Sequence, residues 1–62
     1  SADLLARVNA RVRDGKLIKR GGDVATETLS EGLVREDGLV LYPVYDDIPD
    51  LLVEESFELK DL

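Results

Sequence analysis

The sequence contains no cysteine and no histidine, so it offers neither disulfides nor the usual ligands of zinc. Very small domains commonly rely on such cross-links, because a chain of 62 residues buries only about 60% of its unfolded surface when it folds. Stability must therefore come from packing or from a partner. No apolar stretch approaches the roughly 20 residues that cross a bilayer, and the start lacks the apolar run of a signal peptide. We expect a metal-free, cytoplasmic protein that does not enter membranes.

The chain also lacks the residue patterns of common catalytic sites. Its serines and threonines have no histidine to act as a general base, and no glycine pattern resembles a phosphate-binding loop. The acidic residues from Asp46 onward do not have the spacing of a calcium-binding loop. We predict a non-enzymatic protein without a cofactor, and keep a small enzyme that uses carboxylates only as an alternative.

Charge is unevenly distributed along the chain. Hydrophobic residues make up 44% of the sequence, which favours a folded protein although 35% of residues are charged and the net charge is -6. Six of the eight basic residues lie within residues 1–20, whereas residues 46–62 carry seven acids and one lysine. An acidic chain repels phosphate backbones, so we expect no direct nucleic-acid binding and predict another protein, with a basic or mixed surface, as the partner.

The N-terminal segment predicts a helix that begins near Ala2. Ser1 is suited to cap this helix, and Gly15 marks its latest end because glycine readily adopts the left-handed conformation that terminates helices. The apolar residues of the segment recur at helical spacing: Leu4, Leu5, Val8 and Val12.

Several short segments after the helix predict strands. Residues 16–20 are expected to be extended and to precede a turn at 21–23. Residues 32–35 and 39–42 are β-prone and are separated by a spacer that contains Asp37-Gly38, which indicates an antiparallel hairpin.

The two prolines limit how the sheet can continue. Pro43 is expected at a strand end or a sheet edge because it has no amide hydrogen, and Pro49 favours an extended Ile48. Residues 51–55 are predicted to form a short turn or helix. The predicted fold class is α+β, with a short N-terminal helix packed on a small antiparallel sheet of three or four strands. We expect residues 1–62 to form a single small domain, and leave open whether residues 56–62 form a flexible acidic tail.

Three motifs follow one another along the chain. They are Leu4-Leu5, Asp14-Gly15-Lys16-Leu17, and the passage Leu41-Tyr42-Pro43-Val44-Tyr45-Asp46-Asp47-Ile48-Pro49-Asp50-Leu51-Leu52. Their order resembles that of a small bacterial family, which is similar to the zinc-containing Trm activator subunit of tRNA and protein methyltransferases. The resemblance implies a zinc-ribbon-like fold and a subunit that binds and activates a methyltransferase without chemistry of its own.

The sequence departs from this family at the zinc ligands. Ala10 and Arg13 stand at the first cysteine pair, and Arg35 and Gly38 stand near the second, so the resemblance implies a fold without zinc. Arginine cannot coordinate a cation. If both arginines occupy former ligand positions they repel each other, and acids nearby would then neutralise them: Asp14, Glu36 or Asp37. The alternative is that Ala10 and Arg13 simply extend the helix, with Arg13 in solvent.

The family's turn before Ile48 usually contains glycine, and Asp47 occupies that position here. Aspartate is among the residues that tolerate left-handed turns, so we expect the turn to be retained. Asp46 is predicted to cap this turn through bonds to nearby backbone amides.

A partner-binding surface is predicted along Leu39 to Tyr45, as an exposed β edge that accepts a strand of another protein. Self-association through the same edge, giving a homodimer, is the alternative. The division of these apolar residues between core and interface is left open, while Ile48, Leu51 and Leu52 are also expected to dock against Leu5 and Val8. The candidate partner-binding residues are Val40, Tyr42, Pro43, Val44, Tyr45 and Ile48.

Overall fold

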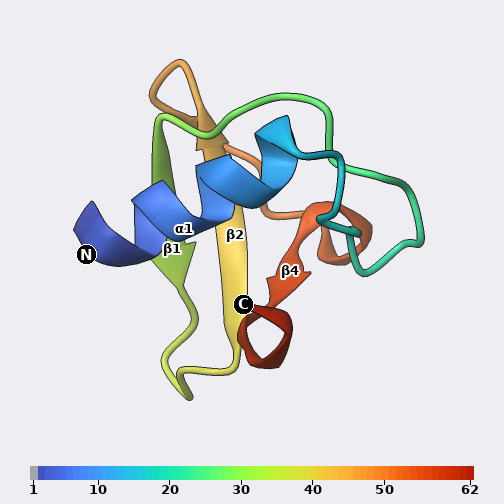
Figure 1. Cartoon of the computed structure of the whole chain (residues 1–62). Coiled ribbons are helices and arrows are strands. Elements are labelled where there is room, and N and C mark those ends of the chain that lie inside the picture. The colour runs from blue at the N-terminus through green and yellow to red at the C-terminus, as the bar shows by residue number, and fades with distance from the viewer. Residues whose placement is uncertain (1) are drawn as a thin grey trace.

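The computed structural model describes residues 2–62, in which an N-terminal helix lies across one face of a small antiparallel sheet (Figure 1). The predicted α+β fold class is therefore confirmed, whereas the predicted N-cap, Ser1, lies outside the described residues. The elements are α1 (Ala2–Arg13), β1 (Glu31–Val34), β2 (Val40–Tyr45), β3 (Ile48–Pro49), β4 (Phe57–Glu58) and the 3-10 turns η1 (Val53–Glu55) and η2 (Leu59–Asp61).

Helix α1 is amphipathic and ends where the sequence predicts. Val8 and Val12 are buried against the sheet. Gly15 adopts a φ of 69°, and the amide of Lys16 donates to the carbonyl of Arg11 at 3.0 Å, so the last carbonyls of the helix have partners.

The connection from α1 to β1 is mostly irregular, and the strand predicted at residues 16–20 is reduced to a single bridge between Ile18 and Val24. Leu17 is buried while Ile18 is exposed, as expected for opposite faces. Asn9 fixes the end of this connection to the helix: its amide group donates to the Leu29 carbonyl at 3.0 Å and accepts from the Leu29 amide at 2.8 Å.

Strand β2 forms the centre of the sheet, so the prediction that Leu39 to Tyr45 is an exposed edge is wrong. It pairs with β1 on one side and with both β4 and β3 on the other. Pro43, predicted at a strand end or edge, is buried within β2. The carbonyl of Pro43 accepts a hydrogen bond from the amide of Asp50 at 2.9 Å, and the nitrogen of Pro43 faces the same side of β2. On that side Pro43 lies in the gap between β3 and β4, so the missing N–H of proline removes no hydrogen bond of the sheet.

The core lies between α1 and the sheet and includes residues from both ends of the chain. Phe57 of β4 is 0% exposed and lies opposite Leu41. Leu59 and Leu62 pack against the same cluster, so residues 56–62 belong to the fold and the flexible-tail alternative is wrong. The buried cluster consists of Val8, Val12, Leu17, Ala25, Leu29, Leu41 and Phe57.

The turn between β2 and β3 retains the left-handed conformation expected for it. Asp46 and Asp47 have φ values of 50° and 65°, the backbone of a tight hairpin turn. The prediction that Asp46 caps this turn is wrong, because within residues 2–62 the Asp46 carboxylate makes no hydrogen bond. The amide of Asp47 instead donates to Ser30 Oγ at 3.4 Å. None of the helices within residues 2–62 has the length and apolar character needed to span a membrane.

Candidate protein interface

The structure separates the six predicted partner-binding residues into three groups. Val40, Pro43 and Val44 are buried, so their side chains cannot reach a partner in this fold. Tyr42 and Tyr45 are partly buried. Ile48, with 69% of its surface exposed, is the one member of the set that is freely accessible.

The two tyrosines lie on opposite faces of the sheet because side chains alternate along a strand. Tyr45 packs against the core on the α1 side, near the Lys19–Glu55 ion pair. Tyr42 lies on the face without a helix, directly opposite Leu33 of β1. Tyr42 and Leu33 therefore form a cross-strand pair next to the edge of the sheet.

Strand β1 forms one edge of the sheet, and two of its residues direct their backbone groups away from the sheet. The backbone amide of Arg35 donates to the carbonyl of Val40 at 2.8 Å, so Arg35 and Val40 form a hydrogen-bonded pair of the ladder. Hydrogen-bonded pairs alternate along an antiparallel ladder, so the N–H and C=O groups of Gly32 and Val34 point outward. This is the arrangement that accepts an additional strand.

A groove lies between this edge and the start of α1. It has a volume of about 330 Å³ and is mainly apolar. Gly32 has no side chain and passes directly over Leu41, which lies at the base of the groove. The lining residues are Ala2, Leu4, Leu5, Ser30, Glu31, Gly32 and Leu41.

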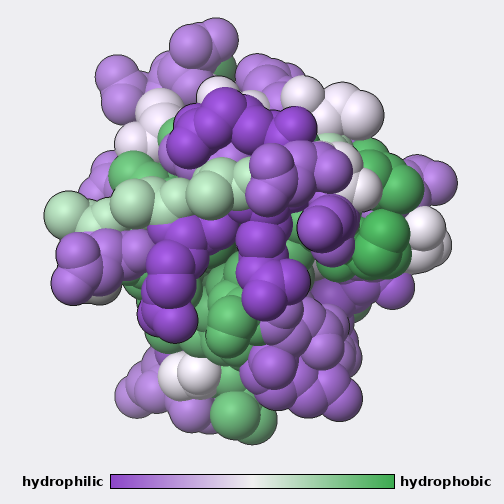
Figure 2. All heavy atoms as spheres, in the orientation of Figure 1, coloured by the Kyte–Doolittle hydropathy of each residue, from purple (hydrophilic) through white to green (hydrophobic). Residues whose placement is uncertain are grey.

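Apolar side chains reach the surface beside β1. Leu33 and Val34 are 41% and 45% exposed, and Leu39, before β2, is 63% exposed. Figure 2 shows apolar surface below α1 as well as a second area on the right of the view. Leu39 belongs to the predicted surface from Leu39 to Tyr45, whereas Leu33 and Val34 do not, because the free edge was predicted on the strand that follows them.

A second group of exposed apolar residues follows the turn at Asp46. Leu51 and Leu52 are 63% and 58% exposed, and Ile48 is more exposed still, so the prediction that these residues dock against Leu5 and Val8 is wrong. The core position predicted for Ile48, Leu51 and Leu52 is instead occupied by Phe57 and Leu41.

The ion pairs stabilise the connections around the sheet. A hydrogen bond from Lys19 Nζ to Glu55 Oε1 at 2.8 Å raises the pKa of Lys19, and burial raises the pKa of the Tyr45 phenol. Arg35 binds Asp37 through two nitrogens, and these hydrogen bonds lower the pKa of Asp37. Asp37 is thus the neutralising partner of Arg35, one of the three acids predicted for that role.

The positions that the resemblance assigns to metal ligands do not form a site. Ala10 and Arg13 lie in the last turn of α1, and Arg35 and Gly38 lie at the hairpin between β1 and β2, on different sides of the fold in Figure 1. Across residues 2–62, no group of three or more acidic, cysteine or histidine side chains is arranged to hold a metal ion.

The fold has a counterpart among solved structures. A protein of Xylella fastidiosa, known from a solution NMR structure, superimposes on this chain with a TM-score of 0.82 and 26% sequence identity, over 94% of this chain and 60% of that chain. The chain thus spans about 60% of the length of that protein. No known family model and no curated protein sequence matches the chain. The likeness supports the fold and carries no function to this chain.

Proposed function

We propose that this chain is a non-enzymatic binding subunit that takes up an extended segment of a partner protein along β1. The observation that carries the proposal is the outward direction of the Gly32 and Val34 backbone groups beside an apolar groove. A strand added to such an edge receives backbone hydrogen bonds, while its alternating side chains determine which partner fits.

The side chains of an added strand would meet different surfaces on the two faces of the sheet. On the α1 side, one set of partner side chains would enter the groove above Leu41. On the other face, the alternate set would cover Leu33 and Tyr42. A partner segment with apolar residues at alternate positions fits both surfaces.

Apolar contacts must contribute a large part of the affinity. Gly32 and Val34 together offer up to four backbone hydrogen bonds, each worth about 1 kcal/mol net. A micromolar complex requires about 8 kcal/mol. The exposed side chains of Leu33 and Val34 and the groove supply the apolar surface that can provide the remainder.

The resemblance to activator subunits favours a methyltransferase as the partner, and the net charge of -6 favours one with a basic or mixed surface. The test begins with affinity purification of the tagged chain from its native cells and identification of stoichiometric partners. The activator role predicts a methyltransferase that is less soluble or less active without this chain. A stoichiometric partner of another kind would contradict the activator role.

The edge itself is tested with a matched pair of variants. Val34→Pro removes an outward N–H that no bond within the sheet uses, so the chain should remain folded and lose the partner. Val34→Thr keeps the N–H and the branched shape, and should retain binding. If Val34→Pro binds as well as Val34→Thr, the partner does not add a strand to β1.

Self-association is the second candidate, because an antiparallel pairing of β1 with β1 of another copy would satisfy the same outward groups under two-fold symmetry. Sedimentation over a concentration series distinguishes the two functions. A dimer of the parent chain that is lost in Val34→Pro supports self-association, whereas a monomer at all concentrations contradicts it.

A further inference from the structure

A second cavity lies on the face of the sheet that α1 leaves uncovered, and it is lined mainly by basic and apolar side chains. Its volume is about 510 Å³. Val40 and Glu58 lie opposite each other across β2 and β4, and their side chains are on the face without a helix. The lining residues are Arg20, Arg35, Gly38, Leu39, Val40, Glu58, Leu59 and Lys60.

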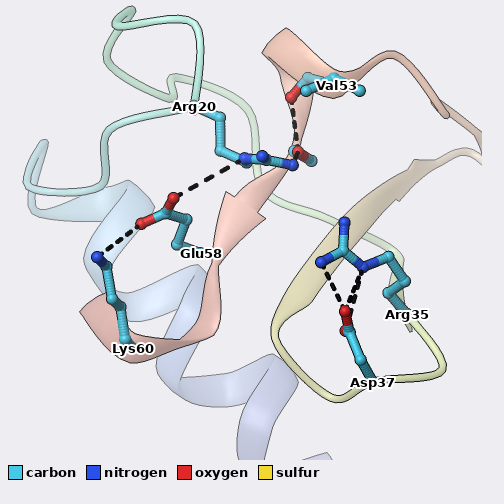
Figure 3. Close-up of polar contacts among 7 residues, drawn as sticks. Arg20, Arg35, Asp37, Val53, Glu58 and Lys60 are labelled. Atoms are coloured by element: carbon cyan, nitrogen blue, oxygen red, sulfur yellow. Dashed lines mark hydrogen bonds and ion pairs between the residues drawn. The ribbon is translucent and has the colours of Figure 1, made fainter.

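The charges around this cavity leave positive charge uncompensated. Glu58 is shared between two cations, with Arg20 Nε at 4.0 Å and Lys60 Nζ at 3.3 Å (Figure 3). Arg35 is neutralised separately by Asp37, at 2.7 Å. With Arg35 paired to Asp37, Arg20 and Lys60 face the single carboxylate of Glu58, so the cavity keeps one uncompensated positive charge in a chain whose net charge is -6. Local positive charge of this kind attracts an anion.

Arg20 is held in position by the segment before β4. Its amide donates to the Ser56 carbonyl at 2.8 Å, and its Nη1 donates to Ser56 Oγ at 3.4 Å. The Ser56 hydroxyl is buried and donates to the Val53 carbonyl at 2.6 Å. The next residue, Gly21, lies so close to Glu54 that a Cβ atom would come within 2.7 Å of Glu54 Cβ.

The guanidinium of Arg20 retains donors for a ligand. A guanidinium has five N–H groups, and its two contacts here, with Ser56 Oγ and with Glu58, are long ones of 3.4 and 4.0 Å. Oxyanions match the fork of an arginine and form its strongest hydrogen bonds. Leu39 and Leu59 add apolar surface next to these donors.

We infer that this cavity binds a small molecule that combines an oxyanion, carboxylate or phosphate, with an apolar part. Arg20 and Lys60 bind the oxyanion, and Leu39 and Leu59 contact the apolar part. Glu58 competes with the ligand for Arg20 and Lys60. The site does not depend on the proposed partner, because its lining contains neither Gly32 nor Val34 of the β1 edge.

The test is a titration of the whole chain, followed in proton–nitrogen correlation spectra at constant ionic strength, with phenyl phosphate, benzoate and inorganic phosphate. Saturable shifts are expected at the amides of Arg20, Leu39 and Glu58. Phenyl phosphate should bind about threefold or more tightly than inorganic phosphate, because its ring covers apolar surface. The comparison of phenyl phosphate with benzoate identifies the preferred oxyanion.

Removing a positive charge from the cavity should weaken binding, and removing the negative charge should strengthen it. Arg20→Gln and Lys60→Gln should each weaken phenyl phosphate binding about tenfold, whereas Glu58→Gln should strengthen it. Arg7→Gln, the same charge change on the exposed side of α1, is the matched control and should have little effect. If Arg20→Gln does not fold, the binding of phenyl phosphate by Lys60→Gln and Glu58→Gln tests the site. Shifts that do not saturate, or equal losses in Arg7→Gln and Lys60→Gln, would overturn the inference.

Discussion

Gly32 of β1 and Leu41 of β2 lie in such close contact that a Cβ atom at Gly32 would come within 2.5 Å of Leu41 Cδ1. Leu41 is buried in the core, on the same face of the sheet. The missing side chain at Gly32 therefore lets Leu41 occupy the space beneath β1, and it leaves the groove beside α1 open.

Replacing Gly32 with alanine should destabilise the fold. The added methyl group must displace Leu41 from its packed position, and strain of this kind typically costs about 1–3 kcal/mol. Urea denaturation measures the loss. Glu31→Ala, at an exposed position of the same strand, should change stability much less. Equal stability of the two variants would mean that the core adapts to the methyl group without strain.

Truncating Phe57 should cost more than any change in the exposed part of the C-terminal segment. The side chain is fully buried, and Phe→Ala changes in cores typically cost about 3–5 kcal/mol, comparable to the whole stability of a small domain. Asp61→Ala, at an exposed position nearby, is the control. Thermal unfolding followed by circular dichroism distinguishes them. A folded Phe57→Ala protein with an unchanged melting temperature would show that residues 56–62 do not support the core.

The elements that depend on local signals could be predicted from the sequence. Helix α1 follows from apolar residues at helical spacing and ends at Gly15, which has the left-handed φ expected of a helix stop. The hairpin of β1 and β2 follows from two β-prone segments around Asp37-Gly38. In both cases the residues that decide the structure lie within a few positions of one another.

The position of β2 in the sheet could not be predicted because its neighbours are too short to leave a pattern. Strands β3 and β4 have two residues each, and β4 joins the sheet through Phe57, a single aromatic residue in an acidic segment. The free edge consequently lies on β1, not on the strand with the two tyrosines. Composition also gave no reason for Phe57 to be buried while Leu51 and Leu52 stay exposed.

The turn at Asp47 offers a test of backbone strain. Its φ of 65° suits glycine better than a residue with a Cβ atom. Asp47→Gly and Asp47→Ala remove the same charge, so their difference isolates the conformational contribution. We expect the glycine variant to be more stable than the alanine variant by about 1 kcal/mol, as measured by urea denaturation. Equal stability would indicate that the turn changes conformation in the alanine variant.

Stability should fall in the alkaline range through two groups that act in the same direction. The pKa of Lys19 is raised by its hydrogen bond to Glu55, and the pKa of Tyr45 is raised by burial. In each case the folded state holds its proton more tightly than the unfolded state, so the stabilisation is present below the unfolded pKa and is lost as the pH rises through the folded pKa.

Urea midpoints at about pH 8 and about pH 11 measure this loss. Tyr45→Phe cannot ionise and Lys19→Gln carries no charge, so each variant should lose less stability than the parent over this interval. If both variants decline as steeply as the parent, the alkaline loss arises from other groups.

The two tyrosines should separate partner binding from folding. Tyr45 packs against the core, so Tyr45→Ala should destabilise the chain, whereas Tyr42 lies on the face without a helix, opposite the exposed Leu33. An aromatic side chain beside a free edge provides contact area at low entropic cost. Tyr42→Ala should therefore remain folded and bind the native partner about tenfold more weakly, a change of about 1.4 kcal/mol.

The control for Tyr42→Ala is Asp61→Lys, a charge reversal in η2 at an exposed position away from β1. Binding of the purified partner is measured by calorimetry, and folding of each variant by circular dichroism. If Tyr42→Ala is folded and binds as well as the parent while Asp61→Lys loses the partner, the interface lies on the acidic C-terminal segment and the β1 edge is not used. Loss in Tyr42→Ala alone supports the edge, because Leu33 and Tyr42 together form the surface next to an added strand.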